Sequence, residues 1–82
     1  MTLEDFAKMM SITPVLAEDV PGKSSTGIFR KLRDEFVDSL LPGDTVYFYD
    51  SNEADWQKTM GREGYILVRQ GVIVADLMTK MN

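Results

Sequence analysis

The sequence contains neither cysteine nor histidine. Without cysteine the chain has no disulfide and no thiolate nucleophile, and without histidine it loses the usual zinc ligand and the usual proton shuttle at neutral pH. Catalysis would have to use Asp, Glu, Lys, Ser, Thr or Tyr. The neighbouring acids Asp44, Asp50 and Glu53 are spaced for helix capping as much as for acid–base chemistry. We therefore expect a protein that is not an enzyme, with no catalytic residue, no metal site and no cofactor.

Long apolar runs are also missing. Runs such as Tyr65–Val68 and Val72–Ala75 span four residues, whereas a membrane helix needs about twenty. The first residues carry Glu4 and Asp5 where a secretory signal carries positive charge. The sequence thus predicts a soluble, cytoplasmic protein that does not bind a membrane.

The chain has no excess of positive charge. Nine basic and thirteen acidic residues give a net charge of −4, and both halves of the chain are acidic. A basic cluster at Lys23, Arg30, Lys31 and Arg33 is followed by acids on the same predicted helix, which is typical of a solvated helix face. We do not expect nucleic acid as a partner.

Glycine is too sparse for a phosphate-binding loop. Gly22-Lys23-Ser24 matches the end of such a loop, but the pattern requires another glycine five positions before Gly22, where the chain has Ala17. Two acidic residues follow Ala17 and would repel phosphates. We interpret the stretch as a turn that leads into a capped helix.

Apolar periodicity and turn residues predict three helices and three strands. The main helix spans Gly27–Leu40, with one apolar stripe formed by Ile28, Phe29, Leu32, Phe36 and Leu40. Short helices are expected over residues 3–10, where Pro14 then prevents continuation, and near residues 53–60; residues 15–24 are expected to be irregular. The predicted strands are Thr45–Tyr49, Tyr65–Arg69 and Val72–Met78, the last two joined by a Gln70-Gly71 turn.

That turn predicts the register of the final hairpin, with Arg69 opposite Val72, Val68 opposite Ile73 and Ile66 opposite Ala75. One face is then wholly apolar and should bury against the main helix: Ile66, Val68, Ile73, Ala75 and Leu77. The other face mixes apolar and charged side chains: Tyr65, Leu67, Arg69, Val72, Val74 and Asp76.

The predicted fold class is α+β, in a single small domain over residues 1–82. We expect a three-stranded, largely antiparallel sheet with a C-terminal β-hairpin, packed on one main amphipathic helix plus two short helices. The direction of the first strand stays open, because residues 50–63 are long enough for a helical crossover.

A chain of 82 residues has little material to cover both faces of such a sheet. The mixed face therefore indicates a small acidic protein–protein interaction domain, whose partner is another protein or a second copy in a homodimer. Trp, Tyr and Arg dominate interface energetics, although Trp56 is also spaced to pack inward with Met60. The candidate interaction residues are Trp56, Arg62, Tyr65, Leu67, Arg69, Val72 and Val74.

The alternative function is binding of a small anionic ligand. Such a ligand would use the backbone N–H groups at a helix N-terminus or in the glycine-flanked Gly61–Gly64 segment. The candidate residues are Lys23, Ser24, Ser25, Thr26 and Arg62.

The C-terminal half of the chain, GDTVYFYDSNEADWQKTMGREGYILVRQGVIV, resembles a group of small uncharacterised bacterial proteins. The shared features are a strand led by Gly-Asp, a Trp-bearing segment, a Gly-Arg-x-Gly step and a final hairpin. The resemblance implies a free-standing bacterial protein, and no activity or site residue is carried over from that group.

Overall fold

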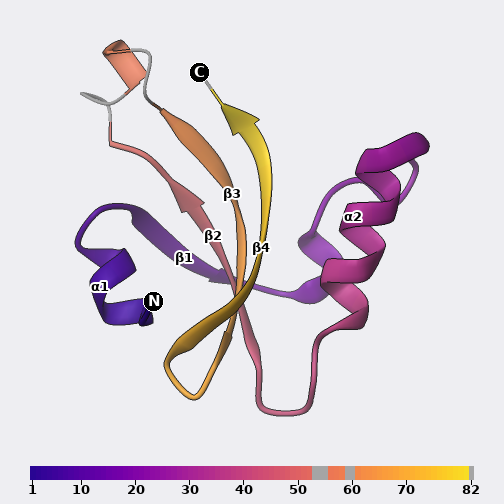
Figure 1. The fold of residues 1–82 in the computed structure, drawn as a ribbon, viewed down its shortest axis with the longest axis horizontal. Coiled ribbons are helices and arrows are strands. Elements are labelled where there is room, and N and C mark those ends of the chain that lie inside the picture. The colour runs from indigo at the N-terminus through magenta and orange to yellow at the C-terminus, as the bar shows by residue number, and fades with distance from the viewer. Residues whose placement is uncertain (53–55, 59–60, 82) are drawn as a thin grey trace.

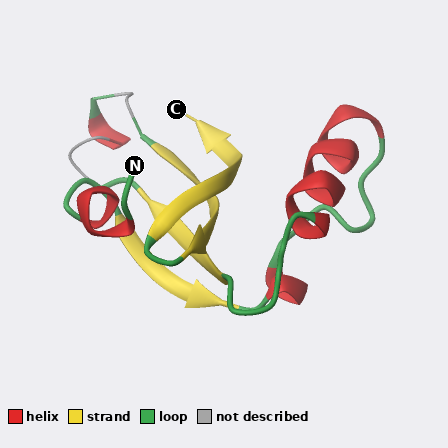
Figure 2. Cartoon of the chain, turned by 60° about the horizontal axis from the view of Figure 1, so that its bottom comes forward, coloured by secondary structure: helices red, strands yellow, loops and turns green. Residues whose placement is uncertain are grey.

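The computed structural model describes residues 1–52, 56–58 and 61–81. Within them the chain forms an α+β fold, as the sequence predicts, with a sheet in the order β1-β2-β3-β4 whose neighbouring strands are all antiparallel (Figures 1 and 2). The named helices are α1 (Leu3–Ala7), the 3-10 turn η1 (Ala17–Asp19) and α2 (Gly27–Asp38). The strands are β1 (Ser11–Val15), β2 (Thr45–Asp50), β3 (Arg62–Arg69) and β4 (Val72–Met81).

Strand β1 corrects the predicted count of three strands. Residues 11–15 form an edge strand that pairs with β2, with Ile12 opposite Tyr49 and Val15 opposite Val46. Pro14 cannot donate a backbone hydrogen bond, and an edge strand tolerates it because one side of the strand needs no partner. The first helix is correspondingly shorter than residues 3–10, and Thr2 caps it by accepting a 3.1 Å hydrogen bond from the Asp5 amide.

The main helix is confirmed, but its apolar stripe is only partly covered. Phe36 is the buried residue of α2, whereas Ile28 is 76% exposed and Leu32 is 48% exposed. Figure 1 shows why: α2 stands beside β4, on the opposite side of the sheet from α1. The half of α2 that carries Ile28 and Leu32 therefore lacks a covering layer. The short helix expected near residues 53–60 falls partly outside the described residues, of which Trp56 and Gln57 are helical.

The register of the final hairpin is confirmed only next to its turn. Arg69 lies opposite Val72 and Val68 opposite Ile73, but Leu67 then lies opposite Ala75 and Ile66 opposite Asp76. A β-bulge causes this shift, because it places Val74 as an extra residue on β4. A second shift, beside Glu63 and Gly64, leaves Thr79 as the extra residue.

These bulges change which residues share a face of the sheet. Leu67, Leu77 and Val46 pack with Phe36 of α2 and with Val20, which follows η1. Ile66, Val68 and Tyr49 pack with Phe6 of α1 on the other face. The predicted apolar face is thus wrong in part, since its members divide between the two layers.

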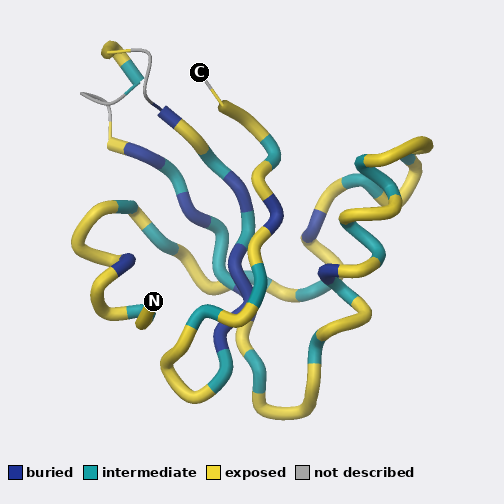
Figure 3. The backbone as a smooth tube through the Cα atoms, viewed as in Figure 1, coloured by how far each residue is buried: buried dark blue, intermediate teal, exposed yellow. Residues whose placement is uncertain are grey.

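Helices of the chain lie over both faces of the sheet. Ile66 is 1% exposed and Leu67 is 0% exposed, although adjacent side chains of a strand point to opposite faces. Figure 3 shows that buried segments recur along the central strands β2 and β3. The expectation that so short a chain leaves one face uncovered is therefore wrong for the centre of the sheet. Large exposed apolar side chains lie on β4 and along α2, and others lie at Met1, Met9, Leu16 and Leu41.

Candidate functional site

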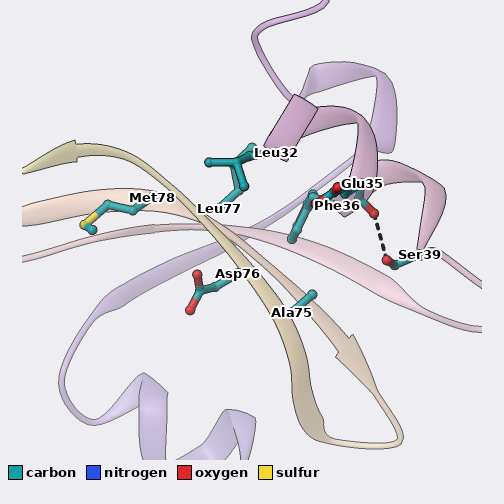
Figure 4. Close-up of a pocket in the computed structure, with 8 residues that line it drawn as sticks. All are labelled: Leu32, Glu35, Phe36, Ser39, Ala75, Asp76, Leu77 and Met78. Atoms are coloured by element: carbon teal, nitrogen blue, oxygen red, sulfur yellow. Dashed lines mark hydrogen bonds between the residues drawn. The ribbon is translucent and has the colours of Figure 1, made fainter. Parts of the chain in front are cut away.

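A groove runs between α2 and the outer edge of β4. It has a volume of about 530 Å³, and its lining is shared equally between the two elements. The helix and its C-cap residue supply Leu32, Glu35, Phe36 and Ser39, and the strand supplies Ala75, Asp76, Leu77 and Met78 (Figure 4). We call it the α2–β4 groove.

The strand side of the α2–β4 groove is a backbone edge. Side chains of a strand alternate between its faces, so a hollow over one face would be lined by every second residue. Here four consecutive residues, 75–78, line it. Figure 4 agrees: the Asp76 carboxylate points away from Leu32 and Phe36.

Within the described part of the chain, the outer edge of β4 is occupied only at its start. The Leu3 amide donates to the Gly71 carbonyl at 2.8 Å, and the Ile73 amide donates to the Met1 carbonyl at 3.0 Å. This short bridge pairs Thr2 with Val72. Beyond Ile73, no strand within the described residues pairs with that edge.

Two bulges limit the regular part of this edge. Val74 is the extra residue before the groove, and Thr79 is the extra residue after it. Bulges twist an edge strand and discourage indiscriminate pairing along its length. The regular open edge between them is Ala75–Met78, the same four residues that line the groove.

The walls of the groove are apolar and its charged groups are acidic. Leu32 and Met78 are 48% and 44% exposed, while Phe36 and Leu77 form a buried floor. Glu35 is exposed on the helix side, and Asp76 lies on the strand side. Neither carboxylate forms an ion pair within the described residues.

The structure does not gather the predicted interaction residues on one surface. Leu67 lies in the core, and Tyr65 packs half-buried against the same cluster, with its ring centroid 5.3 Å from that of Phe48. Val72 and Val74 are 43% and 45% exposed beside the N-terminal bridge. Leu67 therefore cannot meet a partner while the chain is folded, which corrects its place among the candidates.

Trp56 packs against the chain as part of the connection between β2 and β3. Its indole N–H donates to Asp50 at 2.8 Å, and the Lys80 ammonium lies 5.2 Å from the ring centroid. A Cβ added at Gly61 would lie 2.2 Å from the ring, so Gly61 makes room for it. Trp56 is half-buried, so it is neither the fully buried core residue nor the fully exposed interface residue that the sequence allows.

Arg69 has a structural partner. Its guanidinium donates twice to the Asp44 carboxylate, at 3.0 and 2.8 Å, and only 2% of the Asp44 side chain is exposed. The Arg69 hydrogen bonds, together with one from the Leu41 amide, hold the pKa of Asp44 below its usual value. The pair ties the loop after α2 to the end of β3.

Replacing Asp44 with Asn should flatten the acid dependence of stability. The unfolded pKa of Asp is about 3.9, and the folded pKa is lower, so the ionised Asp44 stabilises the fold above pH 4. That contribution to stability is lost as the pH falls through the pKa of Asp44 in the folded state. Asp44→Asn should lower the urea midpoint near pH 7 and reduce its decline below about pH 4. A urea midpoint that declines as steeply in the variant as in the wild type would contradict this role. Some decline should remain in the variant, because the pKa of Asp34 is also lowered, by Arg30 and Arg33.

The residues of the anion alternative are not brought together. Arg62 is exposed at the start of β3 and lines a 240 Å³ hollow beside α1, together with Tyr49 and Asp76. Burial, and to a smaller extent Asp76, raises the pKa of Tyr49, whereas Arg62 opposes that rise. Lys23, Ser24, Ser25 and Thr26 line neither this hollow nor the α2–β4 groove, and Lys23 accepts a hydrogen bond from Arg30 through its carbonyl.

Within residues 1–52, 56–58 and 61–81, no group of three His, Cys, Asp or Glu side chains is arranged to hold a metal ion. No described helix combines the length and the apolar character required to cross a bilayer. Neither observation bears on the α2–β4 groove.

No protein-family model, curated protein or solved structure matches the chain. A functional proposal therefore depends on the geometry of the molecule itself. The sequence points to one wall of the groove, because Leu32 belongs to the apolar stripe predicted for the main helix, but it does not show that Leu32 stays exposed.

Proposed function

We propose that the protein is a non-enzymatic interaction domain that binds an extended segment of another protein in the α2–β4 groove. The bound segment would lie beside Ala75–Met78 as a fifth strand. The observation that carries this proposal is the alignment of an unpaired strand edge with an apolar groove. Main-chain hydrogen bonds to such an edge supply affinity, and pockets for alternate side chains supply specificity.

The amount of exposed surface supports a binding role. The chain exposes 5452 Å², whereas a compact monomer of 9.3 kDa exposes about 5,000 Å². The excess, about 450 Å², accords with the large apolar side chains that are left exposed on α2 and β4. The radius of gyration, 12.7 Å, likewise exceeds the value of about 11.7 Å expected for this length.

The interaction function expected from the sequence is retained, but it is assigned to a different surface of the molecule. A protein–protein interaction remains the leading function, and the bacterial origin and cytoplasmic location expected from the sequence remain part of it. The surface shifts from the Trp56–Tyr65 segment and the hairpin face to the α2–β4 groove. The reason is that Leu67 and Tyr65 already pack within the chain, whereas Leu32 and Met78 do not bury their apolar surface.

Hydrogen exchange tests the proposed mode of binding. Peptides are first isolated from a random-peptide display library by their binding to the wild-type protein. A bound peptide should slow exchange of the outward-facing amides within Ala75–Met78 by at least about tenfold, because strand addition hydrogen-bonds that edge, whereas the alternate amides of β4 already bond to β3. Amides of residues 56–58 serve as the internal comparison, since they belong to the surface expected from sequence and lie outside the paired strands. Protection there instead, or failure to isolate any peptide, would overturn the proposal.

A further inference from the structure

We infer that the segment bound in the α2–β4 groove is cationic, with basic side chains alternating with apolar ones. This inference rests on the proposed function and specifies the chemistry of the partner. Three features carry it: the face to which Asp76 points, the apolar lining beneath α2, and the absence of a basic residue among the described residues that line the groove.

Strand geometry divides the side chains of an added strand between two environments. Those on the α2 side would enter the groove against Leu32, Phe36 and Leu77, where apolar groups are favoured. Those on the other side would lie beside Asp76, which shares the α1 face with Ile66. Directly opposite side chains of neighbouring strands lie about 5 Å apart, so a Lys or Arg at that position would meet the Asp76 carboxylate.

The charge on the helix side of the groove also favours a basic partner. Glu35 is exposed at the groove, and its carboxylate has no ion-pair partner among the described residues. The chain as a whole carries −4. Glu35 lies at the groove, whereas Asp76 faces the other side of the β4 edge, where Arg62 lines the same hollow beside α1. Neither carboxylate forms an ion pair among the described residues, so together they favour a basic segment over an acidic one, which provides specificity as well as faster association.

The same charges disfavour a second copy of this chain as the occupant. The open edge has the sequence Ala-Asp-Leu-Met, which contains no basic residue that could pair with Asp76 of another copy. An antiparallel pairing centred on Asp76 would place two carboxylates opposite each other. The nearest cation on β4, Lys80, lies beyond the second bulge and sits over Trp56.

Charge reversal at Asp76 tests the inference. Peptides selected on the wild-type protein should be enriched in Lys and Arg at alternate positions, and Asp76→Lys should weaken their binding by at least about tenfold. A peptide in which the Lys opposite Asp76 is changed to Glu should bind Asp76→Lys more tightly than it binds the wild type. Glu18→Lys, an equal change of net charge at an exposed acid outside the groove, should alter affinity by less than about threefold.

The outcomes separate this inference from the proposed function. Neutral or acidic peptides that protect Ala75–Met78 would overturn the cationic partner and leave strand addition intact. Failure to select any peptide would overturn both. A concentration-dependent dimer in sedimentation, with exchange protection at Ala75–Met78 in the absence of peptide, would show that a second copy occupies the groove and would overturn the inference.

Discussion

Replacing either Ile66 or Leu67 with Ala should lower the free energy of unfolding by about 2–5 kcal/mol. The two residues are adjacent in β3 and almost completely buried, yet Leu67 packs beneath α2 and Ile66 packs beneath α1. Each substitution removes apolar contacts and leaves a cavity. A domain of 82 residues has about 4–12 kcal/mol of stability in total, so either variant should approach unfolding at physiological temperature.

The comparison between these two variants is more informative than either alone. Urea denaturation should give similar losses, because both faces of the sheet are covered. Val72→Ala, at a site that is 43% exposed on the neighbouring strand, is the control and should cost less than about 1 kcal/mol. A loss below about 1 kcal/mol for one of the two buried sites would mean that its face is open in solution, an outcome that the sequence predicts for the face of Leu67.

Local patterns in the sequence predicted the elements that depend on neighbours in the chain. The apolar spacing in residues 27–40 predicted α2, and Gln70-Gly71 predicted a tight turn. Both turn residues have positive φ, 52° for Gln70 and 77° for Gly71, as such a turn requires. Strand β1 was missed because its residues contain Pro14 and are held by pairing with the distant strand β2.

The faces of the hairpin could not be derived in the same way. Val72–Ala75 is apolar at every position, so polar alternation cannot fix its register or reveal that Val74 forms a bulge. This extra residue moves the side chains of β4 between Val74 and the second bulge, at Thr79, to the other face. The sequence therefore predicted that Ala75 and Ile66 share a face, whereas Ile66 lies opposite Asp76.

The α2–β4 groove could not be derived because it depends on where a helix lies relative to an edge strand. Ile28 and Leu32 belong to the apolar stripe and were expected to be buried. In the structure α2 continues past the part of the sheet that buries Phe36, which leaves both side chains exposed. Amphipathic spacing shows which side of a helix is apolar, but it does not show how much of that side finds a partner.

Placing a lysine on the helix wall of the groove should weaken the binding of an extended peptide by at least about tenfold, or about 1.4 kcal/mol. Leu32→Lys removes an apolar contact from the wall and puts an ammonium group where the bound segment has to exclude water. The variant should fold normally, since Leu32 is 48% exposed. Its urea midpoint should lie close to that of the wild type.

The most direct measurement of the central claim is the affinity of a selected peptide for Leu32→Lys and for Ile28→Lys, determined by calorimetry. Ile28 is one helical turn away on α2 and 76% exposed, but it does not line the groove, and its replacement adds the same charge. If the α2–β4 groove is the recognition surface, Leu32→Lys should lose at least about tenfold in affinity while Ile28→Lys loses less than about threefold. Equal affinities for the two variants would place binding elsewhere on the molecule and contradict the account.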